Sequence, residues 1–280
     1  MLEIISLQAE HAGILEDVLP QDIIRRIAGY EASGLAFAEE DGSMAASIVI
    51  QPDEEGSAQI LWLYTEPHLR RQGLATDLLR EAGIVCQELG GFYRITLEST
   101  RDPEEEDSLY GFCKARGFEI EASPVGCFSV TLGAARKQER LSGKNPKGVV
   151  SYGALTQTER KRLLDEGQDL EELMSENRIE EEMSCMFLRE GEIESLLILE
   201  REESGLSVAW ARTSAASPQQ IVLLLQYAIS HSDRYPDDTP IHIPVLNDVS
   251  EKLAKKLFGD DLKRTEEGYV ATIALFGDEE

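Results

Sequence analysis

The stretch Leu61–Thr76, with the sequence LWLYTEPHLRRQGLAT, decides the fold, because an apolar strand pattern runs through a proline turn into a glycine loop and then a helix. Residues 74–89 repeat apolar side chains at three- and four-residue spacing, and Gly90-Gly91 follows them, so a helix with a defined end is predicted. A helix that begins at a glycine loop directs unpaired N–H groups and its positive end at one point, which suits a diphosphate. Gly73 lets the backbone approach such a ligand, although a glycine beside two arginines is about as often an ordinary solvated loop.

Two segments of the chain resemble the GNAT superfamily of acyl-CoA-dependent N-acetyltransferases. The family signature places a strand and a proline turn before Gln/Arg-x-x-Gly-x-Gly/Ala, and LYTEP at 63–67 followed by RRQGLA at 70–75 fills it without a gap. Downstream, LYGFCKARGF at 109–118 is similar to the closing helix of the family and the Gly-Phe pair that starts the next strand. The resemblance implies an α/β fold, layered as α+β, in which a mixed, mostly antiparallel sheet is flanked by helices.

Composition indicates a protein of two modest domains. The chain has 280 residues, of which 42% are hydrophobic, and this is enough for two cores of ordinary size. No apolar run approaches the about 18 residues that cross a bilayer, and the start lacks a signal pattern, so the cytoplasm is the expected location. The four cysteines show no Cys-x-x-Cys spacing, so neither a disulfide framework nor a metal site is expected. A formal charge of −26 argues against nucleic acid or an anionic membrane as a partner.

The predicted order of strands and helices occurs twice along the chain. We predict a first GNAT-like domain at 1–133, a polar linker at 134–148 and a second GNAT-like domain at 149–280. Helices are expected at 10–18 and 170–180, among others, and two short strands at 118–121 and 127–132. Between Thr213 and Gln220 the second copy has neither a Gly nor an Arg, and Ser217-Pro218 caps its central helix instead. The second copy is therefore predicted to be degenerate, without a diphosphate site.

The resemblance implies that acetyl-CoA is the co-substrate and that an acceptor amine attacks its thioester directly. By position, the strand residues would hold the pantetheine arm through their main chain, the loop residues would surround the diphosphate, and Arg70 would brace the loop. The predicted cofactor-binding residues are Leu63, Tyr64, Thr65, Arg70, Arg71, Gln72, Gly73, Leu74, Ala75 and Thr76.

The proton carriers depart from the family pattern. Many relatives have a tyrosine four residues before the Gly of the closing Gly-Phe, where it protonates the leaving thiolate, and here Cys113 occupies that position. Tyr110 lies about one turn earlier and replaces it only if the helix is shifted, the alternative being a half-buried packing residue. Glu66 and Glu98 end the two strands that flank the expected acceptor cleft and are the candidate bases, with Tyr64 beside them, although such carboxylates are often only surface residues.

Two function classes follow from these observations. The first is an N-acetyltransferase for a small-molecule or peptide amine, which the acidic segment 101–107 would favour if the amine is cationic. The second is a non-catalytic acyl-CoA-binding or protein-interaction module, motivated by Cys113 and the lost second diphosphate site. The sequence identifies no acceptor and leaves a homodimer open.

Overall fold

The computed structural model describes residues 2–7, 19–39, 43–53, 56–142, 146–164, 178–189, 192–213 and 219–275. Contacts divide the chain into two compact units. Unit 1 comprises Met1–Ser123 with Gly268–Glu280, and unit 2 comprises Pro124–Glu267. The predicted helix at 10–18, all but the last three residues of the one at 170–180, and the Ser217-Pro218 cap lie outside the described residues.

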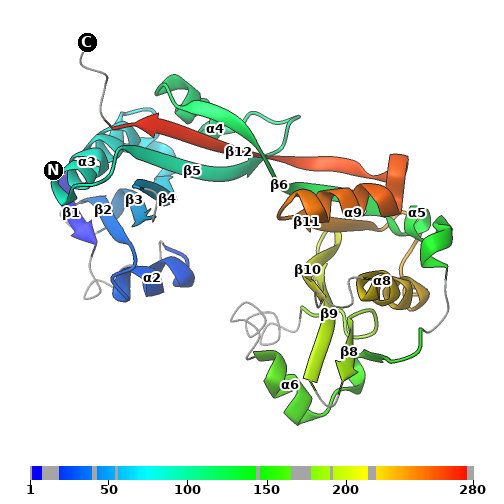
Figure 1. Cartoon of the computed structure of the whole chain (residues 1–280). Helices are drawn as coiled ribbons and strands as arrows, with labels where there is room; N and C mark the ends of the chain where they lie inside the picture. Colours follow the sequence, from blue (N-terminus) through cyan, green and yellow to red (C-terminus); the bar gives the residue numbers. More distant parts are fainter. Residues whose placement is uncertain are drawn as a thin grey trace. The chain divides into compact units, whose positions relative to one another are not determined.

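Unit 1 is built on a mixed sheet with helices on both faces (Figure 1). Its sheet has the strand order β1-β2-β3-β4-β5-β12, in which β1 to β4 are antiparallel neighbours and β5 is parallel to β4. The elements are β1 (Glu3–Leu7), α2 (Gln21–Ala28), β2 (Ser33–Ala38), β3 (Met44–Pro52), β4 (Ser57–Thr65), the single turn η2 (Pro67–Leu69), α3 (Leu74–Leu89), β5 (Arg94–Arg101), α4 (Ser108–Ala115) and the end of β12 (Lys263–Ala274).

Two apolar clusters hold the layers of unit 1 together. On one face Leu78 and Ala82 of α3 and Cys113 of α4 pack against β3, β4, β5 and β12. On the other face α2 buries its isoleucines, including Ile23 and Ile27, against β1, β2 and β3. Side chains of successive strand residues point to opposite faces, so β2, β3 and β4 contribute residues to both clusters.

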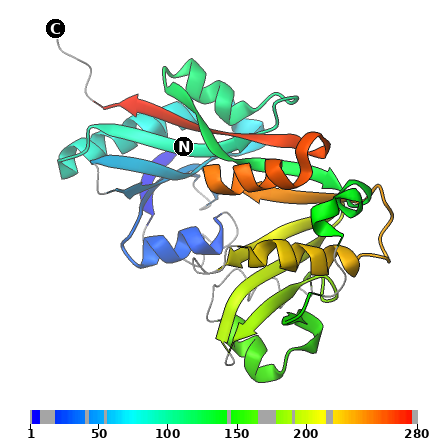
Figure 2. The same ribbon diagram turned by 45° about the vertical axis from the view of Figure 1, so that its right-hand side comes forward.

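Unit 2 repeats the same order of elements (Figure 2). Its strands follow the order β6-β11-β10-β9-β8-β7, with β10 and β11 parallel and the other neighbouring pairs antiparallel. The predicted fold class is thereby confirmed. The elements are β6 (Glu119–Thr131), α5 (Leu132–Lys137), η3 (Glu139–Leu141), β7 (Val149–Ser151), η4 (Tyr152–Ala154), α6 (Gln157–Leu164), β8 (Cys185–Arg189), β9 (Glu192–Glu202), β10 (Gly205–Thr213), α8 (Gln220–Ser230), β11 (Pro240–Val245), α9 (Asp248–Phe258) and η5 (Gly259–Asp261).

Strand β6 is continuous where two short strands were predicted. Its 13 residues include Pro124 and Gly126, which suggested an interruption in the sequence. In the structure a Cβ on Gly126 would lie 2.5 Å from the carbonyl oxygen of Glu266, so the glycine allows the backbone of β12 to approach closely. The part of β6 from Gly126 to Thr131 pairs with β11 in unit 2.

The chain exchanges strands between its repeats. The part of β6 from Pro124 onward belongs to unit 2, although it follows the first copy in the sequence. The part of β12 from Gly268 onward belongs to unit 1, where it neighbours β5. The boundaries of the compact units therefore differ from the sequence ranges 1–133 and 149–280. Each unit contains a strand segment from the other repeat.

The first half of the predicted linker is packed rather than free. Ala135 and Leu141 of α5 and η3 are buried in the core of unit 2, as is Leu132, which lies just before the predicted linker. Arg136 donates hydrogen bonds of 2.6 and 3.0 Å to the carbonyl oxygens of Ser232 and Tyr235. The polar composition concealed this segment because its few apolar residues all share one buried side.

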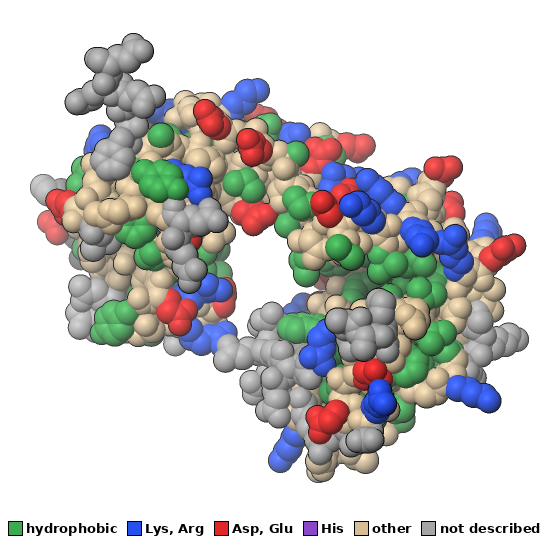
Figure 3. Space-filling view, in the orientation of Figure 1, with side chains coloured by type: hydrophobic (Ala, Val, Ile, Leu, Met, Phe, Trp, Pro, Cys, Tyr) green, Lys and Arg blue, Asp and Glu red, His purple; other side chains and the backbone are tan. Residues whose placement is uncertain are grey.

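On the face that Figure 3 shows, acidic side chains are interspersed with Lys, Arg and uncharged residues. Within the described ranges, no group of three or more His, Cys, Asp or Glu side chains is arranged to hold a metal ion. Nor does any helix in those ranges combine the length and the apolar character that crossing a membrane requires.

Candidate functional site

Strands β4 and β5 separate part-way along their length. They pair in parallel from Ser57 opposite Arg94 to Ile60 opposite Leu97. Beyond that point β4 continues to Thr65 and β5 to Arg101, and no further pair between them occurs in the described chain. Leu61 is an extra residue in the register between β3 and β4, and such a β-bulge bends and twists its strand. The main chain of residues 61–65 therefore offers an unpaired edge toward β5, as strand-like ligands require.

The loop after β4 presents free amides at the start of α3. Gly73 adopts a positive φ of 92° and caps the helix without any side-chain hydrogen bond. Within the described residues, the backbone N–H groups of Gly73, Leu74, Ala75 and Thr76 donate to no protein acceptor. A Cβ built on Gly73 would meet no atom within 4 Å, so the space in front of these amides is open. Four N–H groups and a helix N-terminus at one place attract an anion.

Two arginines shape this loop. The side chain of Arg70 donates a hydrogen bond of 3.1 Å from Nε to the carbonyl oxygen of Thr65, and this contact ties the loop to the end of β4. Arg71 is exposed and has a φ of 65°, a left-handed conformation that is uncommon outside glycine. Both guanidinium groups add positive charge beside the free amides in an otherwise acidic protein.

The predicted cofactor residues lie in two stretches that the hydrogen bond between Arg70 and Thr65 connects. The unpaired edge of β4 contains Leu63, Tyr64 and Thr65, and the cradle of residues 70–76 comes after the turn η2. An open glycine, free amides and two arginines fit a diphosphate, and an unpaired strand edge fits an arm rich in amides. Both features belong to acetyl-CoA, so these residues would hold it as the resemblance implies.

The two candidate carboxylates lie on the same face of the sheet, beyond the point where β4 and β5 separate. Glu98 is on the opposite side of β5 from the buried Ile95 and Leu97, and Glu66 is in line with Trp62 and Tyr64 on β4. A hydroxyl group lies near each carboxylate. Ser123 donates a hydrogen bond of 2.8 Å to Glu98 Oε1, and the Tyr64 hydroxyl faces Glu66.

The surroundings of the Tyr64 hydroxyl change its pKa. Loss of solvent contact and the Glu66 carboxylate raise the pKa of Tyr64, while Arg70 opposes the increase. Its ring stacks with that of Trp62 at a centroid distance of 6.1 Å. At neutral pH Tyr64 is therefore a neutral hydrogen-bond donor next to a carboxylate.

Tyr110 lies on the opposite face of the sheet from the carboxylates. Its ring meets that of Tyr269 edge-on at 5.1 Å, and the guanidinium of Arg101 lies 4.3 Å from its centre. Cys113 is fully buried next to it, and burial followed by the charge of Asp107 raises the pKa of its thiol to about 11. The structure thus joins Glu66, Tyr64 and Glu98 at one face and places Tyr110 and Cys113 at the other.

The acidic segment before α4 is partly structural. Asp107 caps α4, because its carboxylate accepts hydrogen bonds of 2.7 and 2.8 Å from the N–H groups of Leu109 and Tyr110. Asp102 accepts a hydrogen bond of 2.8 Å from the N–H of Glu104. Glu104, Glu105 and Glu106 are exposed and remain available to a solute.

Sequence reasoning missed two features of this region. The bulge at Leu61 has no signal in the sequence, because Leu61 and its neighbours form an uninterrupted apolar run. Tyr269 enters the core of unit 1 from a strand 150 or more residues along the chain from α4, as only the strand order reveals.

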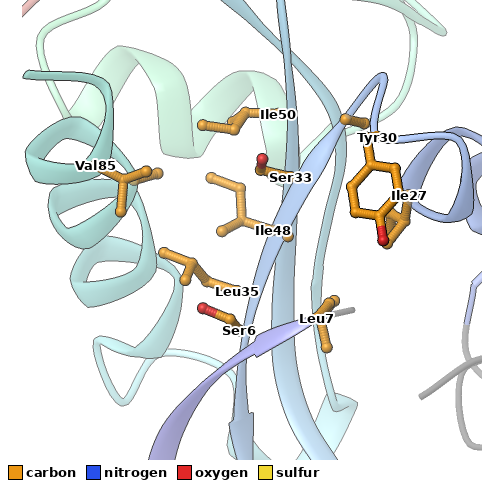
Figure 4. A pocket seen from close by; sticks show the side chains of 12 residues that line it. Ser6, Leu7, Ile27, Tyr30, Ser33, Leu35, Ile48, Ile50 and Val85 are labelled. Atoms are coloured by element: carbon orange, nitrogen blue, oxygen red, sulfur yellow. The ribbon is translucent and has the colours of Figure 1, made fainter. Parts of the chain in front are cut away.

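A cavity of about 410 Å³ lies elsewhere in unit 1, between β1, β2, α2 and α3. Val85 of α3 points toward Leu35 and Ile48 of the sheet in this cavity (Figure 4). None of its lining residues belongs to the predicted site. An extended, negatively charged ligand would cover the separated strands and the free amides. These two features therefore define the site better than the enclosed cavity does.

Known proteins resemble this chain in its family pattern and in its fold. Residues 3–118 match the model of the acetyltransferase (GNAT) family. A search of the curated proteins found no match. Among solved structures, a tandem GNAT protein from the clavulanic acid biosynthesis pathway has a TM-score of 0.60 at 12% identity, with 100% of both chains covered. A conserved protein of unknown function from Enterococcus faecalis V583 has a TM-score of 0.55 at 12% identity, with 98% of this chain and 72% of that chain covered. A GCN5-related N-acetyltransferase from Kribbella flavida has a TM-score of 0.51 at 14% identity, with the same shares covered. At such identities the solved structures show likeness of fold alone.

Proposed function

We propose that this chain transfers an acetyl group from acetyl-CoA to a primary amine of an acceptor, and the match of residues 3–118 to the acetyltransferase (GNAT) family model supports this. The family implies acyl transfer from an acyl-CoA in general. The observation that carries the finer proposal is the open, amide-lined cradle at Gly73, next to an unpaired edge of β4.

The cradle and the strand edge divide the binding of acetyl-CoA between them. The N–H groups of residues 73–76 and the charges of Arg70 and Arg71 receive the diphosphate. The main chain of Leu63 to Thr65 hydrogen-bonds to the pantetheine arm, and an N–H there polarises the thioester oxygen. The bound thioester supplies the electrophilic carbonyl carbon.

The carboxylates act on the acceptor. Most primary amines are protonated at neutral pH and must lose a proton before they attack. Glu98, which accepts a hydrogen bond from Ser123, and Glu66, which neighbours Tyr64, accept that proton directly or through a water. This face of the sheet is therefore the acceptor side of the site.

Binding of acetyl-CoA is the first test, and the chain contains a matched control for it. Gly73 and Gly90 lie at opposite ends of α3, both with positive φ and both with open space where a Cβ would be. Gly73→Trp fills the cradle, whereas Gly90→Trp places the same side chain at a second glycine with positive φ, away from the cradle. We expect calorimetry to show one site per chain in the wild type and in Gly90→Trp, and none in Gly73→Trp. Equal binding by both variants would refute the cradle.

For the acceptor we propose a cationic amine. The exposed Glu104, Glu105 and Glu106, together with the two carboxylates of the acceptor side, give this end of unit 1 a negative potential. Replacing the three glutamates with glutamine is expected to raise the Michaelis constant for a polyamine and leave that for a neutral amino sugar unchanged. An unchanged constant for both acceptors would exclude the acidic segment from recognition.

A second candidate, an acyl-CoA-binding module without catalysis, is favoured by one observation. The position of the usual tyrosine holds the buried Cys113, whose raised thiol pKa makes it a poor proton donor. Release of free CoA above the hydrolysis blank, in the presence of acetyl-CoA and a panel of amines, separates the two functions. Binding without release would identify the module.

A further inference from the structure

The hydroxyl of Tyr269 has no hydrogen-bond partner among the described residues of unit 1. Tyr269 is only 3% exposed, and its oxygen is buried without a hydrogen bond to any described residue. An unpaired buried hydroxyl loses its hydration without compensation and therefore costs stability. A ligand that accepts a hydrogen bond from this hydroxyl would explain why an unpaired polar group is buried here.

Several polar groups surround this hydroxyl without binding it. Burial first, and then electrostatic interactions with Asp107 and Cys113, raise the pKa of Tyr269 to about 12, while Ser99 and Arg101 oppose that rise. Ser99 influences the hydroxyl although no hydrogen bond of normal geometry joins the two. Tyr269 therefore keeps its proton at any working pH and can act only as a neutral donor.

The neighbours also locate the hydroxyl along the strands. Ser99 and Arg101 belong to the part of β5 beyond Leu97, where β5 has separated from β4. Cys113 is the residue at which the resemblance leads one to expect a tyrosine. Tyr269 thus brings a phenol from the last strand of the chain to the α4 side of the open strand pair.

We propose that the Tyr269 hydroxyl donates a hydrogen bond to the sulfur of CoA as the thiolate leaves, a role that rests on the proposed acetyl transfer. The amine nitrogen forms a bond to the carbonyl carbon, and the C–S bond breaks with its electron pair passing to sulfur. The proton of the amine goes to a carboxylate of the acceptor side. Tyr269 retains its own proton, and the thiolate is later protonated by solvent.

The approach to the hydroxyl involves Arg101. The hydroxyl is closed off by its neighbours, and among these Arg101 has the longest side chain, with its guanidinium resting on the Tyr110 ring. We expect the bound acyl-CoA to displace this guanidinium and expose the hydroxyl to sulfur. The edge-on contact between Tyr110 and Tyr269 keeps the phenol in place meanwhile.

The test titrates the thiol of CoA bound to the full chain, followed by the ultraviolet absorbance of the thiolate. Tyr269→Phe keeps the ring and removes only the hydroxyl. We expect it to raise the apparent pKa of the bound thiol by about one pH unit, since a hydrogen bond to a charged group has roughly that strength. Tyr152→Phe is the matched control, because Tyr152 is also 3% exposed but lies in unit 2, and it should leave the titration unchanged.

A structural role would give a different pattern. Tyr269→Phe removes an unpartnered hydroxyl, so its melting temperature should equal or exceed that of the wild type. An unaltered thiol pKa in Tyr269→Phe, or an increase produced by Tyr110→Phe alone, would overturn the proposal. Failure of CoA to bind the wild type would instead overturn the proposed function itself, so the two failures are distinguishable.

Discussion

The two units build the same strand twice and differ in the loop that follows it. In unit 1, Leu61 is the bulge residue of β4 and Trp62 follows it. In unit 2, Ala209 is the bulge residue of β10 and Trp210 follows it. Both strands have a parallel neighbour whose pairing ends before the bulge, at Ile60 opposite Leu97 and at Ser207 opposite His242. The two tryptophans of the chain therefore occupy equivalent positions.

The loops after these strands have different chemistry. Unit 1 continues through Arg70 and Arg71 to Gly73, with free amides at the helix start. The corresponding segment between Thr213 and Gln220 has neither glycine nor arginine, and its residues 214–218 lie outside the described structure. A bulge that is present in both units is explained by the requirements of the fold. A glycine loop that is present in one unit is better explained by ligand binding. The comparison thus supports the proposal that acetyl-CoA binds to unit 1 alone.

The largest expected effect tests which part of the chain completes unit 1. A chain that ends at Glu267 loses Tyr269 and Ala271, both buried in the core of unit 1, and the hydrogen bonds that join Leu275 to Tyr93 and Gln87. The loss should exceed the about 3–5 kcal/mol that one buried aromatic side chain contributes. We expect acetyl-CoA binding to disappear and the cooperative unfolding of unit 1 to be lost, as calorimetry would show.

A full-length variant controls for non-specific effects of shortening the chain. Ala271→Asp places a carboxylate at a position with no exposed surface and should abolish binding in the same way. Wild-type affinity in either protein would mean that unit 1 is complete without the last strand, and the exchange of strands would have no functional consequence.

The sequence predicted the parts of this comparison that depend on local pattern. The bounds of β4 and α3 follow from an apolar run that ends at a proline turn and from a helical repeat that ends at Gly90-Gly91. The bulge at Leu61 and the continuity of β6 through Pro124 and Gly126 could not be predicted. Each depends on which backbone lies alongside, and Gly126 is readable as a close approach only once Glu266 is known to face it.

The prediction of intermediate size tests whether the β-bulge at Leu61 is needed for ligand binding or only for the fold. Deleting Leu61 leaves Ile60 and Trp62 on their present faces but restores regular pairing with β3, so β4 should pair further along β5. We expect affinity for acetyl-CoA to fall at least about tenfold, because the free strand edge shortens.

Deleting Ala209, the equivalent residue of β10, is the control for that variant. It removes the same feature from unit 2 and should leave acetyl-CoA affinity unchanged. Equal losses from the two deletions, measured by calorimetry, would show that unit 2 takes part in binding and would contradict the assignment to unit 1.

The smallest effect concerns the two equivalent tryptophans. Trp62 donates a hydrogen bond of 3.2 Å from Nε1 to the hydroxyl of Ser47, a residue with no exposed surface, whereas Trp210 packs beside the apolar cluster of β8 and β9 and makes no side-chain hydrogen bond to another described residue. Trp62→Phe should therefore lower the free energy of unfolding by about 1 kcal/mol. Trp210→Phe should lower it by less, because only contact area is lost. Denaturant unfolding followed by circular dichroism measures both, and since the chain has two tryptophans, the fluorescence remaining in each variant reports the unit that was not altered. Equal losses of unfolding free energy would show that the two tryptophans contribute equally to the stability of their strands. The difference between the units would then lie entirely in the loop at Gly73.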